Sequence, residues 1–250
     1  MAAIQQLTNV DGRSVRGREV APDHLAVIMD GNRRWAELHA LPVTEGYRLG
    51  AVRFGELLEW CWEARIEVVT AWALSTANLA RPPATVSELL NVIVDGLQEL
   101  SRDRRWCLRP IGCLDLLPDP IAIRLSEIAQ STLEGRGLIA NVAIAYDGRE
   151  EITSAVRSLV RERACAGDHM LDLAERITAG DIGERLYTCG QPEPDLVIRT
   201  SGEQRLSGFM PWQTADAELY FSPVAWPDFT RERFAAALEA YAKRKRRHGL

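Results

Sequence analysis

Short apolar runs, most of them closed by turn or polar residues, alternate along the chain with longer stretches of helical periodicity. Residues 24–29 are apolar at nearly every position and are followed by Asp30, Gly31 and Asn32, a pattern typical of a parallel strand buried on both faces. Similar patterns predict further strands over residues 67–74, 106–112, 138–145 and 196–198.

Helices are predicted between these strands. Apolar side chains recur near helical spacing in residues 46–64, and Pro82 and Pro83 suit the first turn of a helix that runs to about residue 100. Strand–helix alternation predicts an α/β fold: a central, mainly parallel β-sheet flanked by helices on both faces. Other helices are expected from about residue 120 and over residues 149–163, 171–177 and 231–245.

The chain shows no boundary between domains. Its 250 residues contain no internal repeat, low-complexity tract or linker, so a single catalytic domain is expected over residues 23–250. Residues 1–22 are polar, lack periodicity and are expected to form a flexible N-terminal segment. No apolar run approaches the ~18 residues of a membrane span, and the N-terminus lacks the pattern of a secretory signal.

Composition and charge exclude several classes of protein. With 46% hydrophobic and 26% charged residues, the chain has the composition of a soluble globular protein. Its five scattered cysteines, none spaced as C-x-x-C, favour a reducing cytoplasm over a disulfide framework or a structural zinc site. The formal charge of −5 argues against general nucleic-acid binding, although a basic run at residues 243–247 ends an otherwise acidic chain.

Several common catalytic motifs are missing. The sequence contains no P-loop, no dinucleotide-binding glycine motif, no H-E-x-x-H and no G-x-S-x-G. Its four histidines are far apart in sequence, so a histidine-centred metal site or catalytic triad is not expected.

Two segments that follow predicted strands combine arginines with turn residues. Residues 30–34 provide backbone amides and two arginines that could bind a phosphate group. Asp30 adds a carboxylate that could bind Mg²⁺. The alternative is an ordinary helix cap. Residues 199–207 contain Arg199, Arg205 and Ser207, which would form a second anion site; the alternative is a polar surface loop.

Two more segments add candidate chemistry. Residues 75–82 also follow a predicted strand, and residues 212–221 carry Glu218 inside an apolar stretch, a costly position for a carboxylate that is neither paired nor metal-bound. The alternative for Glu218 is a solvated side chain on a half-exposed strand. Because ligands bind beyond the carboxyl ends of parallel strands, the four segments together predict one cleft for two phosphorylated substrates and one Mg²⁺.

These residues carry a resemblance to the cis-prenyltransferases, the undecaprenyl diphosphate synthase family, that extends from about His24 to Gly249. Residues 24–35 are similar to the family's opening signature. Gly46 and Tyr47, with Gly208, are most similar to the short-chain actinobacterial branch that makes Z,E-farnesyl diphosphate. The closing signature is matched by residues 195–207, Trp212-Gln213, Glu218 and Trp226-Pro227.

The resemblance implies a Mg²⁺-dependent, homodimeric prenyltransferase with an apolar tunnel, acting on dimethylallyl, geranyl and isopentenyl diphosphates. Asp30 would bind the metal with help from Glu218, and Asn78 would act in catalysis from a mobile loop that also holds Arg81. Residues 31–34 would surround the allylic diphosphate, and the C-terminal R-x-G would complete the site in the dimer. The implied substrate-binding residues are Gly31, Asn32, Arg33, Arg34, Trp35, Tyr47, Arg81, Arg199, Arg205, Ser207, Arg247 and Gly249.

Four positions depart from the commonest family pattern. Tyr47 replaces a histidine, Val43 an arginine, Asp216 a tyrosine and Ala77 the glutamate of the loop motif Ser-Thr-Glu-Asn. An alanine in that loop resembles members that make lavandulyl-type skeletons by joining C1 of one allylic unit to C2 of another, the head-to-middle mode.

The sequence leaves the coupling mode and the product open. Regular head-to-tail coupling must remove a proton from C2 of isopentenyl diphosphate, and Ala77 leaves the loop without its usual glutamate. Ala77 and Asp216 together therefore slightly favour head-to-middle coupling over head-to-tail coupling. The alternative is neutral drift in the loop. A C10–C15 product is expected, although Ala73 stands where short-chain relatives carry a bulky residue.

Two other functions are retained as alternatives. One is a non-catalytic partner subunit of a prenyltransferase complex, and the other is a generic phosphate-binding α/β protein. Asp30 together with the complete arginine set favours the enzyme, because degenerate subunits of this family usually lack them.

Overall fold

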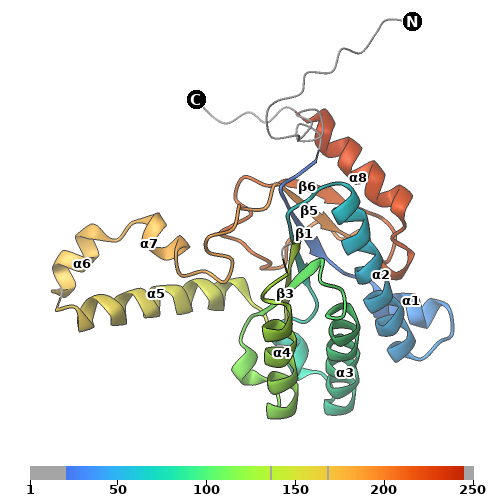
Figure 1. The fold of residues 1–250 in the computed structure, drawn as a ribbon, viewed down its shortest axis with the longest axis horizontal. Helices are drawn as coiled ribbons and strands as arrows, with labels where there is room; N and C mark the ends of the chain where they lie inside the picture. The colour runs from blue at the N-terminus through green and yellow to red at the C-terminus, as the bar shows by residue number, and fades with distance from the viewer. Residues whose placement is uncertain (1–20, 136, 168, 245–250) are drawn as a thin grey trace, which may run out of the picture.

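The computed structural model describes residues 21–135, 137–167 and 169–244 and contains a parallel sheet with helices packed against it (Figure 1). The order across the sheet is β3-β4-β2-β1-β5-β6, and every neighbouring pair is parallel. The predicted α/β fold is therefore confirmed. The strands are β1 (His24–Ile28), β2 (Val68–Trp72), β3 (Trp106–Ile111), β4 (Leu138–Ala143), β5 (Leu196–Arg199) and β6 (Glu218–Phe221).

Most predicted helices are present with small shifts at their ends, whereas α1 and α7 were not predicted from periodicity because each is too short to show it. The α-helices are α1 (Asn32–Leu38), α2 (Val43–Glu63), α3 (Pro83–Leu100), α4 (Asp119–Thr132), α5 (Gly148–Cys165), α6 (Met170–Arg176), α7 (Ala179–Gly183) and α8 (Arg231–Lys243). Short 3₁₀ helices lie at η2 (Thr76–Ala80), η3 (Leu114–Leu116) and η4 (Trp226–Asp228).

Strand β1 has a core on each side. Leu25 and Val27 belong to a large core shared with α2, α3, α4 and α8, whereas Ala26 and Ile28 belong to a smaller core on the opposite face. Tyr146, before α5, and the loop residues Phe209 and Met210 cover that second face. Figure 1 shows α5, α6 and α7 extending away from the sheet. Burial on both sides explains the continuous apolar run that predicted β1.

Strand β6 was not among the strands expected in the core. The structure adds it in parallel at the edge of the sheet beside β5. All of its residues are half-buried, so its sequence lacks the fully apolar run that marks a central strand. The prediction that residues 196–198 form the last core strand therefore missed one edge strand.

Some predictions concern residues outside the described ranges. They include the N-terminal segment 1–22, except for its last two residues, as well as Arg247, Gly249 and the end of the last predicted helix. No helix in the described part of the chain is long and apolar enough to cross a membrane.

A buried polar network crosses the second face of the sheet. His24 is fully buried; its Nδ1 lies 2.7 Å from the Pro192 carbonyl oxygen and its Nε2 lies 2.8 Å from the Thr70 hydroxyl. The Asn141 amide donates to the same hydroxyl and also to Gln191. Burial lowers the pKa of His24 from 6.5 to about 4, so the folded protein keeps this ring neutral at physiological pH.

This buried histidine predicts a pH-dependent stability. Below pH 6.5 the unfolded chain binds a proton at His24 that the folded chain resists down to about pH 4. The free energy of unfolding is therefore expected to fall as the pH drops through this window, by about 3 kcal/mol in total. Urea unfolding from pH 7 to pH 4 measures it. His24→Gln should remove most of this slope, and an equal slope in both proteins would contradict the assignment.

Candidate active site

The segments that sequence analysis singled out meet at one edge of the sheet. Strands β1, β2 and β5 are parallel neighbours, so the residues that follow them emerge on the same side. Asp30 follows β1, the loop with η2 follows β2, and residues 200–207 follow β5. This is the edge at which α/β proteins bind their ligands.

Asp30 is held between two arginines. Its Oδ2 accepts a hydrogen bond from Arg199 Nη2 at 2.8 Å, and its Oδ1 accepts one from Arg34 Nη2 at 3.1 Å. The Thr200 hydroxyl accepts from the Asp30 backbone N–H and donates to its carbonyl. The Asp30 side chain is 28% exposed, so its carboxylate is fixed and still accessible from the pocket it lines.

Arg199 is the most buried cation of the site. Its side chain is only 6% exposed, and besides Asp30 it donates to the Ser207 hydroxyl at 2.8 Å and to the Arg205 carbonyl at 2.5 Å. Its Nε has no partner among the described residues. A buried guanidinium of this kind is stable because Asp30 compensates its charge, and these bonds fix its position beside the pocket.

Trp226, from the closing signature, connects the turn at Asp30 to helix α2 through two hydrogen bonds. Trp226 donates its backbone N–H to the Asp30 carbonyl at 2.9 Å and its indole N–H to the Gly50 carbonyl on α2 at 2.8 Å. Gly31 has φ 104°, and a Cβ there would lie 2.9 Å from the Cβ of Ala225. A glycine is therefore required where the turn packs against this segment.

A polar pocket of about 530 Å³ brings the predicted residues together. Four buried polar atoms from its lining have no partner within the described chain: Asn32 Oδ1, Tyr47 Oη, Trp72 Nε1 and Arg199 Nε. Buried polar groups are rarely left unpaired, so this concentration indicates a site for a polar ligand. The predicted site residues that line it are Asp30, Gly31, Asn32, Arg33, Arg34, Tyr47, Asn78, Arg81, Arg199 and Ser207.

Arg33 and Arg81 are the cations of this pocket that form no ion pair within the described residues. Arg33 is exposed on α1 and Arg81 is half-buried just after η2, so they approach the pocket from different segments. Together with the paired Arg34 and Arg199 they give the pocket more arginines than carboxylates. Its lining therefore favours a ligand with several negative charges.

Helix α1 lies against two glycines of α2, a feature that sequence analysis missed. A Cβ on Gly46 would lie 2.3 Å from the Asn32 carbonyl oxygen, and a Cβ on Gly50 would lie 2.5 Å from Asn32 Oδ1. Their spacing of four residues places both on one face of α2. This spacing was the available signal in the sequence, because it allows another backbone to approach closely.

Gly46→Ala is expected to displace α1 and its arginines, because the nearest atom to the new Cβ belongs to the backbone. We expect a lower melting temperature and a roughly tenfold to hundredfold loss of turnover, since misplacement by about 1 Å can cost a hundredfold. Thermal melting and initial rates measure both.

The matched control is Gly55→Ala in the same helix. Its Cβ would lie 3.4 Å from Leu100 Cδ2, an ordinary van der Waals distance. This variant should retain turnover within about twofold and gain helix stability. Equal losses in the two variants would show that the α1 contact has no special importance.

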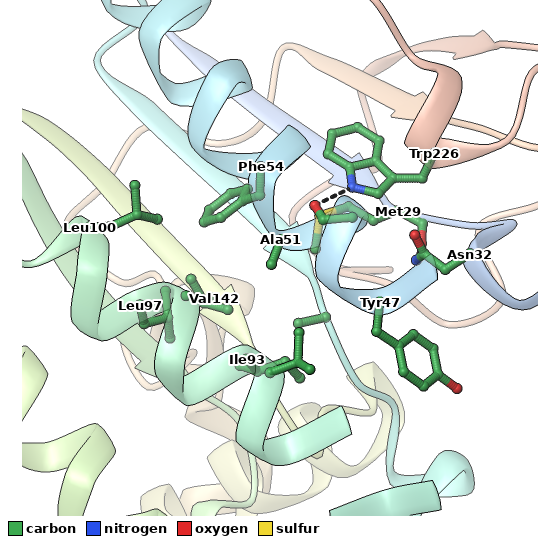
Figure 2. A pocket seen from close by; sticks show the side chains of 14 residues that line it. Met29, Asn32, Tyr47, Ala51, Phe54, Ile93, Leu97, Leu100, Val142 and Trp226 are labelled. Atoms are coloured by element: carbon green, nitrogen blue, oxygen red, sulfur yellow. Dashed lines mark hydrogen bonds between the residues drawn. The ribbon is translucent and has the colours of Figure 1, made fainter. Parts of the chain in front are cut away.

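A second, apolar cavity of about 60 Å³ adjoins the polar pocket (Figure 2). Met29, Asn32, Tyr47 and Ala73 line both cavities, so the two lie side by side. The apolar cavity extends between α2 and α3 over the sheet. Its other lining residues are Gly50, Ala51, Phe54, Val92, Ile93, Gly96, Leu97, Leu100, Val142 and Trp226.

Two predicted substrate-binding residues do not line the polar pocket. The Trp35 indole N–H donates to the Asp228 carboxylate at 2.8 Å and its ring stacks on His39, so Trp35 braces α1 rather than facing the pocket. Arg205 pairs with Glu203, and its side chain is 61% exposed. It touches the site through its backbone carbonyl, which accepts from Arg199.

Glu218 lies far from Asp30 within the chain, and the metal role implied for it stays a prediction. Glu218 pairs with Leu196 at the start of β5, whereas Asp30 lies beyond the end of β1, where Ile28 pairs with Arg199. Its carboxylate forms an ion pair with Arg244. Its side chain is 29% exposed, so the alternative of a partly solvated glutamate on a half-buried strand also agrees with the structure.

The fit of Mg²⁺ to the site rests on Asp30. No group of three or more histidine, cysteine, aspartate or glutamate side chains suited to a metal occurs in the described ranges. Mg²⁺ in phosphate-transfer sites often uses one or two protein carboxylates and takes its remaining ligands from substrate phosphates and water. A half-buried carboxylate that faces a roomy polar pocket meets that requirement once a diphosphate is present.

Comparison with known proteins identifies the family of the chain. A family model described as "Putative undecaprenyl diphosphate synthase" matches residues 28–249. The (2Z,6E)-farnesyl diphosphate synthase of Thermobifida fusca is 50% identical over 229 residues, which cover 91% of this chain and 90% of that protein. Isoprenyl transferase 1 of Corynebacterium diphtheriae is 47% identical over 230 residues, which cover 91% of this chain and 87% of that protein.

A solved structure is also similar. Lavandulyl diphosphate synthase from Lavandula x intermedia, in complex with dimethylallyl diphosphate, superposes with a TM-score of 0.86 at 31% identity, covering 93% of this chain and 100% of that one. Fold and sequence therefore agree. The chain thus belongs to the undecaprenyl diphosphate synthase family of cis-prenyltransferases and is a prenyltransferase.

Proposed function

We propose that the protein condenses an allylic diphosphate, dimethylallyl or geranyl, with a second C5 prenyl diphosphate to give a C10–C15 product and pyrophosphate. The observation that carries this proposal is a polar, arginine-rich pocket that shares part of its lining with an apolar cavity. A prenyl diphosphate has the same two-part character, an anionic head on an apolar tail. The similarity to (2Z,6E)-farnesyl diphosphate synthases and to lavandulyl diphosphate synthase supports the same substrate class.

The polar pocket would stabilise the charge that develops during the reaction. Breaking the allylic C1–O bond leaves the electron pair on pyrophosphate, and Arg33 and Arg34, which line the pocket, would neutralise that charge. Asp30 would hold Mg²⁺, which when bound supplies further positive charge to the leaving group. Arg199 and Ser207 would bind the diphosphate of the second substrate, with Arg205 at the rim. Asn78 on η2 and Arg81 just after it would cover the reacting ends.

The apolar cavity would hold the allylic tail. At about 60 Å³ it is smaller than the cavity of about 150 Å³ that holds a benzene molecule. This small volume supports short substrates and products.

We propose a homodimer in which a second copy completes the diphosphate site with Arg247 and Gly249. The ion pair between Glu218 and Arg244 supports this arrangement. It holds the chain that leads to Arg247 and Gly249 beside β6. A metal role for Glu218 would then be exercised in the site of the other copy. Light scattering measures the mass, and mixing Asp30→Asn with Arg247→Ala protein should restore activity if each site uses both subunits.

For the coupling mode we propose head-to-middle joining of two allylic units. Ala77, at the exposed start of η2, supplies no carboxylate to the loop that borders the reacting ends. The similarity in structure to lavandulyl diphosphate synthase supports this mode. Head-to-tail coupling with isopentenyl diphosphate is the second candidate, favoured by the higher identity to (2Z,6E)-farnesyl diphosphate synthases.

The test is incubation of purified protein with Mg²⁺ and dimethylallyl, geranyl and isopentenyl diphosphates, alone and in pairs, followed by identification of products. A branched product from allylic diphosphates alone supports head-to-middle coupling. Product only when isopentenyl diphosphate is present overturns that mode in favour of head-to-tail coupling. Binding of pyrophosphate without reaction in any combination would contradict the proposed function and favour a non-catalytic subunit or a phosphate-binding protein.

A further inference from the structure

Three residues form a row across adjacent strands at the edge of the polar pocket. Ile28 at the end of β1 pairs with Trp72 on β2 and with Arg199 on β5. Paired residues of parallel strands point to the same face, and neighbouring strands lie about 4.8 Å apart. All three line the polar pocket, which therefore has a cationic end, an apolar middle and an aromatic end along this row.

The Trp72 ring is held rigidly in this position. It stacks on Phe209 with a centroid separation of 5.2 Å and an interplanar angle of 8°, and it meets Tyr146 edge-on at 6.3 Å. Tyr146 is fixed in turn, because its hydroxyl donates to Glu151 at 2.5 Å and accepts from the Met210 N–H. The indole N–H of Trp72 is buried and has no acceptor within the described residues.

The proposed reaction places positive charge near this ring whichever coupling mode applies. The new bond joins C1 of the allylic unit to C4 of isopentenyl diphosphate or to C2 of a second allylic unit. In both cases the double bond of the second unit supplies the electron pair, and its C3 becomes electron-deficient. A proton then passes to the released pyrophosphate, and a double bond forms again.

The row of Arg199, Ile28 and Trp72 indicates where C3 of the second unit would lie in the pocket. Arg199 and Ser207 would hold the diphosphate of the second unit, and C3 lies three bonds from the diphosphate oxygen. The hydrocarbon would thus lie over Ile28 with C3 toward Trp72. Resting on the proposed function, we propose that Trp72 is a catalytic residue whose indole face stabilises the positive charge that develops on C3 of the second prenyl unit.

Tyr47, the other aromatic residue in the described lining of the polar pocket, is not suited to this role. It belongs to α2 and to the large core on the opposite face of the sheet from Ile28 and Trp72. It lies where the polar pocket meets the apolar cavity, beside the allylic tail. An indole is also the strongest of the natural aromatic side chains in binding a cation.

Fluorinated tryptophans test the proposal in the full-length protein. Each ring fluorine weakens the negative face of the indole while keeping its shape and its N–H group. We expect log kcat to fall linearly with the number of fluorines, by roughly tenfold in total for a tetrafluorinated ring, with KM for both substrates changing less than twofold. A kcat that does not change with fluorination overturns the proposal.

The chain contains seven tryptophans, so the contribution of Trp72 must be separated from that of the other six. The control is Trp72→Phe labelled with the same fluorinated tryptophans; its kcat should not change with fluorination. If Trp72→Phe does not fold, Trp72→Tyr replaces it. A matching decline in the control protein would also overturn the role of Trp72. If the unlabelled protein turns over no prenyl diphosphate pair, the proposed function fails instead, which is a separate result.

Discussion

Asp30→Asn is expected to reduce kcat for prenyl transfer by at least about a thousandfold. The amide keeps the volume of the side chain and one oxygen that can accept from Arg199, so the chain should still fold, with a lower melting temperature because the buried guanidinium loses its counter-charge. It cannot carry the negative charge that Mg²⁺ requires of a protein ligand. Without the Asp30 charge, Arg34 and Arg199 are left with more positive charge for a diphosphate, which offsets the lost metal in binding. KM for the allylic diphosphate should therefore change by less than about tenfold, and the loss should fall on kcat.

Initial rates of pyrophosphate release over a Mg²⁺ titration measure this effect. The matched control is Asp95→Asn on α3, which also removes an aspartate from an ion pair with arginine but lies outside both cavities. It should retain turnover within about twofold. Activity of Asp30→Asn close to that of the unmodified protein would refute the assignment of the metal to Asp30.

Arg199→Lys is expected to have the second largest effect. A lysine has no planar fork and cannot reach Asp30, Ser207 and the Arg205 carbonyl together, as the guanidinium does. We expect KM for the second diphosphate to rise at least about thirtyfold, with a lower kcat and a lower melting temperature, because the network around a buried charge is broken.

The comparison with Arg205→Lys makes this prediction specific. Both arginines were predicted to bind the second diphosphate, but Arg199 is buried in the network whereas Arg205 is mostly exposed and paired with Glu203. The effect on KM should therefore be at least tenfold smaller for Arg205→Lys. A larger effect at Arg205 would mean that the diphosphate binds at the rim of the pocket rather than against Arg199.

The central strands could be predicted because burial on both faces requires apolar residues at nearly every position, as in β1. Strand β6 was not expected in the core because it is half-buried and follows a long loop. Helix α1, with seven residues, is too short to show a period. Continuous burial is therefore readable from the sequence, whereas edges and short connections are not.

The candidate site was predictable where its chemistry is local. Residues 30–34 and 199–207 contain their arginines, hydroxyls and carboxylate within a few positions of each other, immediately after apolar strands. Trp72 was not marked in this way, because a tryptophan in a core strand is usually a packing residue. Gly46 and Gly50 were informative only once Asn32 was seen against them.

The amino-acid sequence by itself determined the α/β architecture, the family resemblance and the kinds of groups that follow β1 and β5. The tertiary structure decided which of those groups meet. The register that sets Ile28 beside Arg199 joins Asp30 to a partner 169 positions away, and the same register places Glu218 at the far end of the strands. Spacing along the chain cannot encode this outcome, because strand pairing depends on the packing of both faces of the sheet at once.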